Sequence, residues 1–294
     1  MNIIDPHLHL FDFNKGNYPW LRSENPPFWP DKQLIAKNFS EHELLLTSPL
    51  TLAGFVHIEV GYDNQQPWRE IAWLENTCNL PFRSIALLDI TLPKTIFDQQ
   101  LKNLSRFQSL VGIRYILDED ALAILNDKNS QDNLATLATN KLSFELQMPL
   151  ANTQAVERLL AILAITPSLM LCINHAGWPA LGGEQHLYWL KNLKRLANFE
   201  NVFIKCSGFE MVARDYSASW QYVIIKQCIE SFGIDRVMLA SNFPLCLFRA
   251  SYQNTWLANT GQHSTERDNT DPSYNTEQLQ QLCFSNAQRF YKFD

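Results

Sequence analysis

Short apolar segments recur about every 30 residues along the chain, and each is followed by a longer segment with helical spacing of apolar residues. Helical connections force neighbouring strands to run parallel, and eight units in 294 residues favour a closed barrel over a doubly wound open sheet. The sequence therefore predicts an α/β protein with a TIM (β/α)8 barrel. The eight predicted strands are Asn2–His9, Ala53–Val60, Ser84–Ile90, Val111–Ile116, Ser143–Met148, Leu169–His175, Val202–Ser207 and Arg236–Phe243.

The segments between these strands supply the expected outer helices. No Pro/Gly/Ser-rich linker or charge block divides the sequence, so residues 1–294 are predicted to form one domain. The helices that periodicity predicts include Trp68–Thr77, Lys94–Leu104, Thr153–Ile165, Gln185–Ala197, Ser219–Phe232 and Thr276–Tyr291.

Two long segments depart from the repeat. Residues 13–38, after the first strand, are rich in proline and aromatic residues, and residues 245–274, after the last strand, are polar and contain His263 and Glu266. Loops that follow the strands of a parallel barrel lie on the face that carries active sites, and long ones often act as lids. We expect both loops to border the site.

Composition limits the partners and the compartment. The formal charge is −6 and no basic run is present, which argues against nucleic acid. The six cysteines lack C-x-x-C spacing, as expected for reduced thiols in a cytoplasmic protein. The start resembles no signal peptide, and no apolar run reaches the length of a membrane span. The expected partner is a small-molecule substrate, with a homo-oligomer left open.

The strongest local motif is D-P-H-L-H-L-F at residues 5–11. Side chains two apart on a strand point the same way, so His7 and His9 should project together while Leu8 and Leu10 face the helices. Two adjacent imidazoles bind a divalent ion or polarise a substrate oxygen. A catalytic role is therefore predicted for both histidines.

Strand alternation adds polar candidates inside the barrel. In the second strand Val56, Ile58 and Val60 form an apolar row that we assign to the outside, which leaves His57 and Glu59 facing inward. By the same argument, further polar side chains should face inward. Burial of such groups is costly unless they are paired with a partner or take part in a binding or catalytic site. These are Glu145 and Gln147 of the fifth strand and Lys205 and Ser207 of the seventh, and a structural salt bridge between Lys205 and Glu145 or Glu59 is the alternative.

Three strand ends supply further candidates. Arg114, in G-I-R at the fourth strand, suits a substrate carboxylate or a polarised carbonyl. His175, in N-H-A-G-W-P at the sixth strand, stands where a third imidazole joins His7 and His9. Asn242, in S-N-F-P, lies at the rim after the eighth strand.

Together these motifs resemble the amidohydrolase superfamily (amidohydrolase-related family 2). The resemblance is to its branch of TIM-barrel metal-dependent hydrolases, which includes sugar-acid lactonases and 2-pyrone-4,6-dicarboxylate hydrolase. It spans nearly the whole chain and rests also on Y-P-W at residues 18–20, K-C-S-G at 205–208 and N-A-Q-R-F-Y at 286–291. The resemblance implies hydrolysis of a cyclic ester of a small carboxylate or sugar acid. Arg114 and loop aromatics such as Trp20 would then hold the substrate, with His57, Glu145 and Lys205 as further candidate contacts.

The expected cofactor is one divalent metal, zinc first, bound by His7, His9 and His175, with a metal-free mechanism as the alternative. Many superfamily members carry an aspartate at the position of Asn242 as metal ligand and general base, and an amide cannot accept a proton near neutral pH. In this branch S-N-F-P is commonly followed by V-D, whereas Leu245 and Cys246 follow it here, so this second carboxylate is absent as well. Glu59 is the preferred substitute base, since its strand neighbours that of His7 and His9.

Two other functions stay open. A decarboxylase of the same superfamily shares the barrel and H-x-H, although that chemistry favours a strand-eight aspartate. A barrel that kept its pocket and lost turnover, acting as a ligand-binding protein, is the alternative outside enzymes. A metal-dependent nuclease is disfavoured by Arg114 at the fourth strand and by the acidic net charge.

Overall fold

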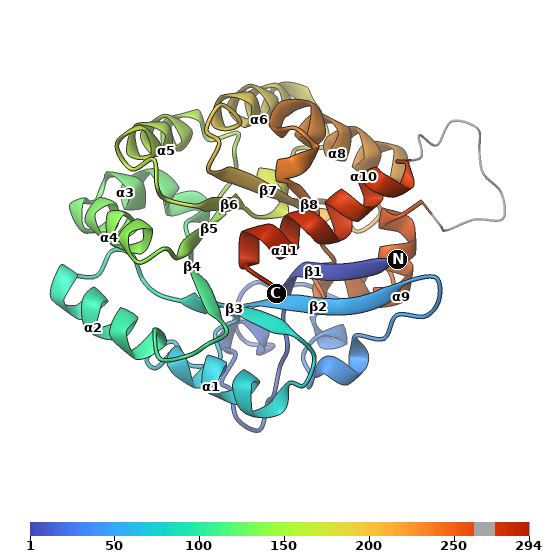
Figure 1. Cartoon of the computed structure of the whole chain (residues 1–294), viewed down its shortest axis with the longest axis horizontal. Helices are drawn as coiled ribbons and strands as arrows, with labels where there is room; N and C mark the ends of the chain where they lie inside the picture. The colour runs from blue at the N-terminus through green and yellow to red at the C-terminus, as the bar shows by residue number, and fades with distance from the viewer. Residues whose placement is uncertain (262–273, 294) are drawn as a thin grey trace.

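The computed structural model describes residues 1–261 and 274–293. Eight parallel strands follow one another in chain order around a single sheet. Helices surround the ring of strands (Figure 1). The TIM barrel is therefore confirmed. The strands are β1 Asn2–Leu8, β2 Thr51–Ile58, β3 Phe82–Leu87, β4 Leu110–Ile116, β5 Ser143–Gln147, β6 Leu171–Ile173, β7 Val202–Cys206 and β8 Val237–Leu239.

The six predicted helical segments are present, with α1, α2 and α5 matching the predicted bounds. Residues 276–291 form one helical segment, interrupted by a π-helical turn over Gln281–Ser285. The α-helices are α1 Trp68–Thr77, α2 Lys94–Leu104, α3 Ala121–Asn126, α4 Lys128–Thr139, α5 Thr153–Ile165, α6 Gly183–Leu196, α7 Phe209–Val212, α8 Ala218–Phe232, α9 Tyr252–Asn259, α10 Thr276–Gln280 and α11 Asn286–Tyr291.

The barrel closes between β1 and the segment that follows β8. A parallel bridge joins Leu8 to Phe243. The His9 amide donates to the Phe243 carbonyl at 2.7 Å, and the Asn242 amide donates to the His7 carbonyl at 3.0 Å. Because these bonds lie at the carboxyl ends of the strands, closure itself brings the two predicted histidines beside Asn242.

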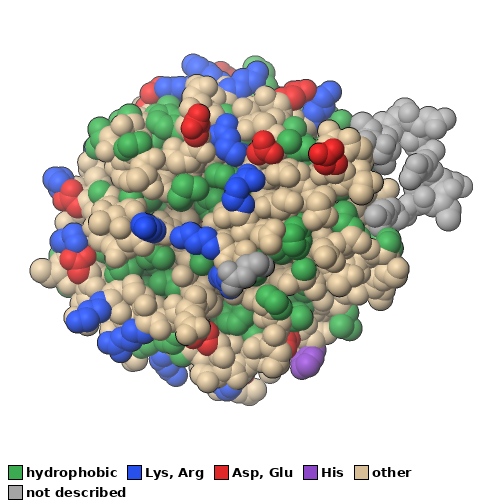
Figure 2. Space-filling model, viewed as in Figure 1, with side chains coloured by type: hydrophobic (Ala, Val, Ile, Leu, Met, Phe, Trp, Pro, Cys, Tyr) green, Lys and Arg blue, Asp and Glu red, His purple; other side chains and the backbone are tan. Residues whose placement is uncertain are grey.

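The barrel interior is apolar at the amino-terminal ends of the strands. It is covered there by α11, which crosses the ring of strands in Figure 1. Ile4, Val56, Ile58, Met238 and Tyr291 belong to one buried cluster there. Both described chain ends lie on this face in Figure 1, so the carboxyl ends of the strands open on the opposite face. Basic and acidic side chains are interspersed around the rim of the same view (Figure 2).

The assignment of Val56 and Ile58 to the outside is wrong, and with it the inward direction of His57. His57 faces α1, where its Nε2 lies 2.9 Å from Glu70 Oε1. A barrel strand is buried on both faces, so its apolar row does not mark the helix side. Glu59 follows the last paired residue of β2, and its side chain reaches the cavity at the strand ends.

Inside the barrel, Lys205 and Glu145 form a salt bridge, which is the structural alternative to a role in substrate binding. Lys205 Nζ lies 2.6 Å from Glu145 Oε2, and both side chains are fully buried. The Tyr291 hydroxyl donates to the other Glu145 oxygen at 2.6 Å. The carboxylate is therefore satisfied from β7 and from α11, which ties the closing helix to the barrel interior.

The two long loops differ in how far they match expectation. Residues 13–38 contain only short 3-10 turns, in keeping with their departure from the repeat. Part of the second loop is helical, because Ser251 accepts a bond from the Asn254 amide and so starts α9, which buries Tyr252 and Trp256. His263 and Glu266 lie outside the described residues. In the described part of the chain, no helix is long and apolar enough to cross a membrane.

Replacing Lys205 with methionine should lower the free energy of unfolding by about 3–5 kcal/mol, because the buried Glu145 carboxyl loses its cation. Urea denaturation followed by circular dichroism measures this change. The matched control is Lys226→Met in α8, where the lysine is exposed and pairs only loosely with Glu230, and its effect should stay within about 0.5 kcal/mol. A loss under about 1 kcal/mol for Lys205→Met would contradict the interpretation.

Candidate functional site

A cavity of about 700 Å³ opens at the carboxyl ends of the strands. Its walls contain six of the predicted catalytic and substrate-binding residues, brought from loops and strand ends far apart in the sequence: His9, Trp20, Glu59, Arg114, His175 and Asn242. Trp20 donates its indole N–H to the Val60 carbonyl at 2.8 Å, so the first long loop borders the cavity as expected. This arrangement is typical of active sites in the barrel fold.

The three predicted imidazoles lie next to one another. The His7 ring is 5.2 Å from the His9 ring and 4.5 Å from the His175 ring, measured between centroids. His9 Nδ1 donates to the Ile58 carbonyl at 2.8 Å, which leaves a lone pair on Nε2. His175 Nδ1 lies 3.1 Å from Ser207 Oγ. Neither ring nitrogen of His7, which is fully buried, has a hydrogen-bond partner among the described residues.

Burial keeps these imidazoles neutral. Removal from water lowers the pKa of His7 and His9 well below the ordinary value and lowers the pKa of His175 to about 3. Arg114 and Lys205 act in the same direction, since a nearby cation disfavours a second positive charge. Neutral imidazoles serve as hydrogen-bond partners or metal ligands, and they add no positive charge to the cavity.

The binding of a metal ion by His7, His9 and His175 stays a prediction. Within residues 1–261 and 274–293, no three His, Cys, Asp or Glu side chains are grouped so that they could hold a metal ion. In the same described residues His7 contacts both other rings, whereas His9 and His175 make no ring contact with each other.

Arg114 is bound to groups of the cavity wall. Its Nε donates to Glu59 Oε1 at 2.7 Å, and one terminal nitrogen donates to the Glu59 carbonyl at 2.6 Å. The other terminal nitrogen donates to Gln147 Oε1 at 3.1 Å. A guanidinium has five N–H groups, so two stay available for a substrate. No described residue donates to the second Glu59 oxygen.

Asn242 contacts a residue that the sequence analysis missed. Its Nδ2 donates to Glu210 Oε1 at 2.6 Å, while its buried Oδ1 has no partner among the described residues. Glu210 lies in α7, directly after β7, and burial raises its pKa to about 7. The only available signal was an acidic residue three positions after the inward-facing Ser207, in a segment that follows a strand.

Three predicted substrate contacts, and the predicted catalytic residue His7, do not line the cavity. Lys205 and Glu145 bond each other deeper in the barrel, and His57 bonds Glu70 behind the sheet. The His57 ring nevertheless supports the site, because its Nδ1 accepts the Leu10 amide at 3.2 Å next to His9.

The backbone around His175 is unusual. His175, Ala176, Gly177 and Trp178 all have positive φ angles, between 51° and 68°. Gly208 faces His175 so closely that an added Cβ would lie 2.4 Å from its Nδ1. Consecutive left-handed residues are costly and persist where the surrounding structure requires them, as at binding sites.

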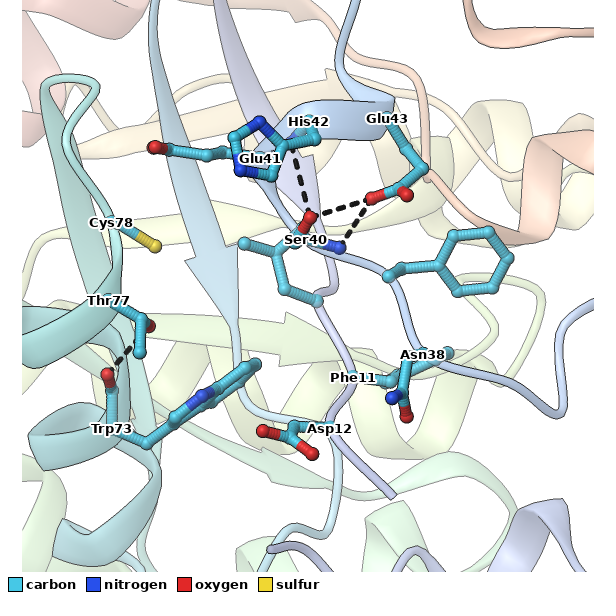
Figure 3. A pocket seen from close by; sticks show the side chains of 12 residues that line it. Phe11, Asp12, Asn38, Ser40, Glu41, His42, Glu43, Trp73, Thr77 and Cys78 are labelled. Carbon is cyan, nitrogen blue, oxygen red and sulfur yellow. Dashed lines mark hydrogen bonds between the residues drawn. The ribbon is translucent and has the colours of Figure 1, made fainter. Parts of the chain in front are cut away.

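A second, smaller cavity of about 310 Å³ lies beside the first long loop and the end of α1. Figure 3 shows its acidic side chains together with Trp73 and Cys78. Glu43 accepts bonds from Ser40, and Glu41 accepts bonds from Asn79 and the Leu80 amide, so both carboxylates serve loop structure. None of the predicted site residues lines this cavity.

Comparison with known proteins identifies the family. The family model described as Amidohydrolase matches residues 4–293. The chain belongs to the amidohydrolase family. The predicted resemblance is therefore confirmed, and this amidohydrolase is an enzyme of the hydrolase class.

Three relatives show the range of the similarity. L-fucono-1,5-lactonase of Burkholderia multivorans is 25% identical over 85% of this chain and 84% of its own. L-rhamnono-gamma-lactonase of Scheffersomyces stipitis is 23% identical over 60% of this chain and 58% of its own. A crystal structure of an amidohydrolase from Burkholderia multivorans with bound zinc superposes over 100% of both chains with a TM-score of 0.78 at 19% identity.

Gly208→Ala should reduce stability by about 2 kcal/mol more than Gly261→Ala, because the φ angles of the two glycines are 68° and 67° but only the Cβ added at Gly208 would meet a neighbour among the described residues. An added Cβ at Gly261 would have no described atom within 4 Å, so that variant reports backbone strain alone. Thermal unfolding of both variants gives the difference. Equal losses would show that His175 is not held by Gly208.

Proposed function

We propose that this amidohydrolase opens the ring of an uncharged lactone of a small sugar acid by attack of water. The observation that carries the proposal is a mainly apolar cavity whose few polar groups are uncharged or already paired. Its one arginine is paired with Glu59, its histidines are neutral, and the Asn242 oxygen has no partner among the described residues. The two lactonase relatives support the same class of substrate.

The charges of the cavity disfavour the dicarboxylates that other members of this branch accept. The charged residues in its wall are Arg114, Glu59 and Asp118. Arg114 already neutralises Glu59, and burial raises the pKa of Asp118, so a dianion would find no free cation there. Placing unpaired charge in a buried site is costly. Hydroxyl groups of a sugar lactone instead match Gln147, Asn242 and the free donors of Arg114.

Catalysis in this proposal uses the side chains that already contact each other. The free N–H groups of Arg114 donate to the lactone carbonyl and stabilise the negative charge that develops on its oxygen. The unbonded oxygen of Glu59 accepts a proton from water, whose oxygen attacks the carbonyl carbon. The C–O bond of the ring then breaks, and Glu59 returns the proton to the leaving alkoxide, so that the charge balances.

In this scheme the histidines bind and orient the substrate. Nε2 of His9 accepts a substrate hydroxyl, because Nδ1 of the same ring already donates to Ile58. His175 binds the substrate beside His7. Trp20 and Trp178 cover the ring and exclude water from one side of the cavity.

The first test compares neutral and charged lactones. Aldono-1,4- and aldono-1,5-lactones should be hydrolysed with kcat/KM at least about 100-fold above that for pyrone dicarboxylates, because the latter place two carboxylates against Glu59 and Asp118. Acid release followed with a pH indicator measures both rates. Parallel assays with a chelator and with added zinc separate the metal-free scheme from a metal-dependent one. Inactivity towards every lactone, or faster turnover of dicarboxylates, would contradict the proposal.

The second test concerns the base. Glu59→Gln should lower kcat by about 10²- to 10⁴-fold with a small change in KM, because the amide cannot accept a proton from water. Steady-state kinetics on the best aldonolactone measures both constants. The matched control is Glu230→Gln, an exposed glutamate in α8, which should retain full activity. A Glu59→Gln enzyme with more than a tenth of wild-type kcat would exclude Glu59 as the base.

A further inference from the structure

Glu210 is a buried carboxyl group outside the cavity wall. Its side chain is 4% exposed, and it lies behind Asn242, with one oxygen 2.6 Å from the Asn242 amide nitrogen. It therefore reaches a bound substrate only through Asn242. Neither the lactone hydrolysis proposed above nor the barrel fold requires a carboxylate in α7.

The backbone of Asn242 is fixed on both sides. Its amide N–H donates to the His7 carbonyl at 3.0 Å, and its carbonyl accepts the Cys246 amide at 3.2 Å. The side-chain amide has two orientations, which exchange the donor and the acceptor. An ionised Glu210 accepts hydrogen bonds but cannot donate, so it selects the orientation with Nδ2 towards itself.

This selection explains the unpartnered oxygen. Asn242 is 1% exposed, and its Oδ1 has no hydrogen bond from the described residues. Asn242 lines the cavity, so this oxygen is available for a donor within it. A buried acceptor without a donor costs about 1–3 kcal/mol, which a substrate hydroxyl or the attacking water offsets when it binds.

We propose that Glu210 is a positioning residue that sets the orientation of the Asn242 amide, so that an acceptor faces the cavity when Glu210 is ionised and a donor faces it when Glu210 is protonated. The proposal deepens the lactone hydrolysis above and rests on it for its catalytic consequence. Protonated Glu210 donates to Oδ1, and the amide turns its N–H groups towards the cavity. The hydrogen bond that holds a substrate hydroxyl or water is then lost.

The surroundings of Glu210 place its protonation near neutral pH. Burial raises its pKa to about 7, against the attraction of Arg214 and Arg249. Tyr216 and Cys246 also face it, and burial raises the pKa of both groups, so they are neutral at this pH. The Arg214 guanidinium is held in place, because it also donates to the Glu210 backbone carbonyl and pairs with Asp31.

The catalytic arm of the test compares pH profiles. In the wild type, kcat/KM for an aldonolactone should rise about tenfold between pH 6 and pH 8, as ionisation of a group with a pKa near 7 requires. Glu210→Gln keeps the size and an acceptor oxygen but cannot ionise, so its profile should change less than about twofold over this range. Glu59→Gln is the control, since it should lower kcat/KM and keep the transition near pH 7.

The second arm does not depend on turnover. The side-chain amide resonance of Asn242, assigned by its absence in Asn242→Asp, should shift with a midpoint near pH 7 in the wild type and stay constant in Glu210→Gln. A resonance that does not move in the wild type, or that moves equally in both proteins, overturns the role of Glu210. Absence of lactone turnover in the wild type counts against the proposed function alone, because the amide resonance still decides the inference.

Discussion

The site depends on how the barrel is closed. β1 and the segment after β8 are joined by backbone bonds from His9 to Phe243 and from Asn242 to His7. Asp5, which is fully buried, strengthens this junction by accepting the amides of Ser241 and His7, both at 3.2 Å. Two segments more than 230 residues apart thus share one hydrogen-bond network. Three of the catalytic candidates, His7, His9 and Asn242, lie on that junction, so barrel closure brings them together.

Burial then decides what each polar group of the barrel can do. Below the site, Lys205 and Glu145 are fully buried and satisfied by each other and by Tyr291, so they stabilise the interior without reaching a substrate. Above them the imidazoles have few charged partners, and desolvation keeps them neutral. The difference is one of pairing: a buried ion persists only with its counter-ion, while a buried imidazole loses its proton.

Sequence patterns predicted the parts that repeat and missed those that depend on one contact. Strand order, the bounds of α1 and α5, and the direction of His7 and His9 follow from periodicity, because each is repeated over several residues. The direction of His57 does not, since both faces of β2 are buried and only Glu70 on α1 decides which face is polar. Glu210 was missed because a turn after β7, which no periodicity describes, carries it to Asn242.

The amide of Asn242, after β8, changes how acid–base chemistry is divided between the carboxylates Glu59 and Glu210. An aspartate at position 242 would lie beside Glu210, and two carboxylates at that distance cannot both ionise near neutral pH. With asparagine there, Glu210 keeps a donor as its partner and ionises near neutrality, while Glu59 is held by Arg114 on the other side of the cavity. Proton transfer and orientation of the acceptor are then served by separate carboxylates. One carboxylate can therefore change protonation during turnover without disturbing the group that the other one orients.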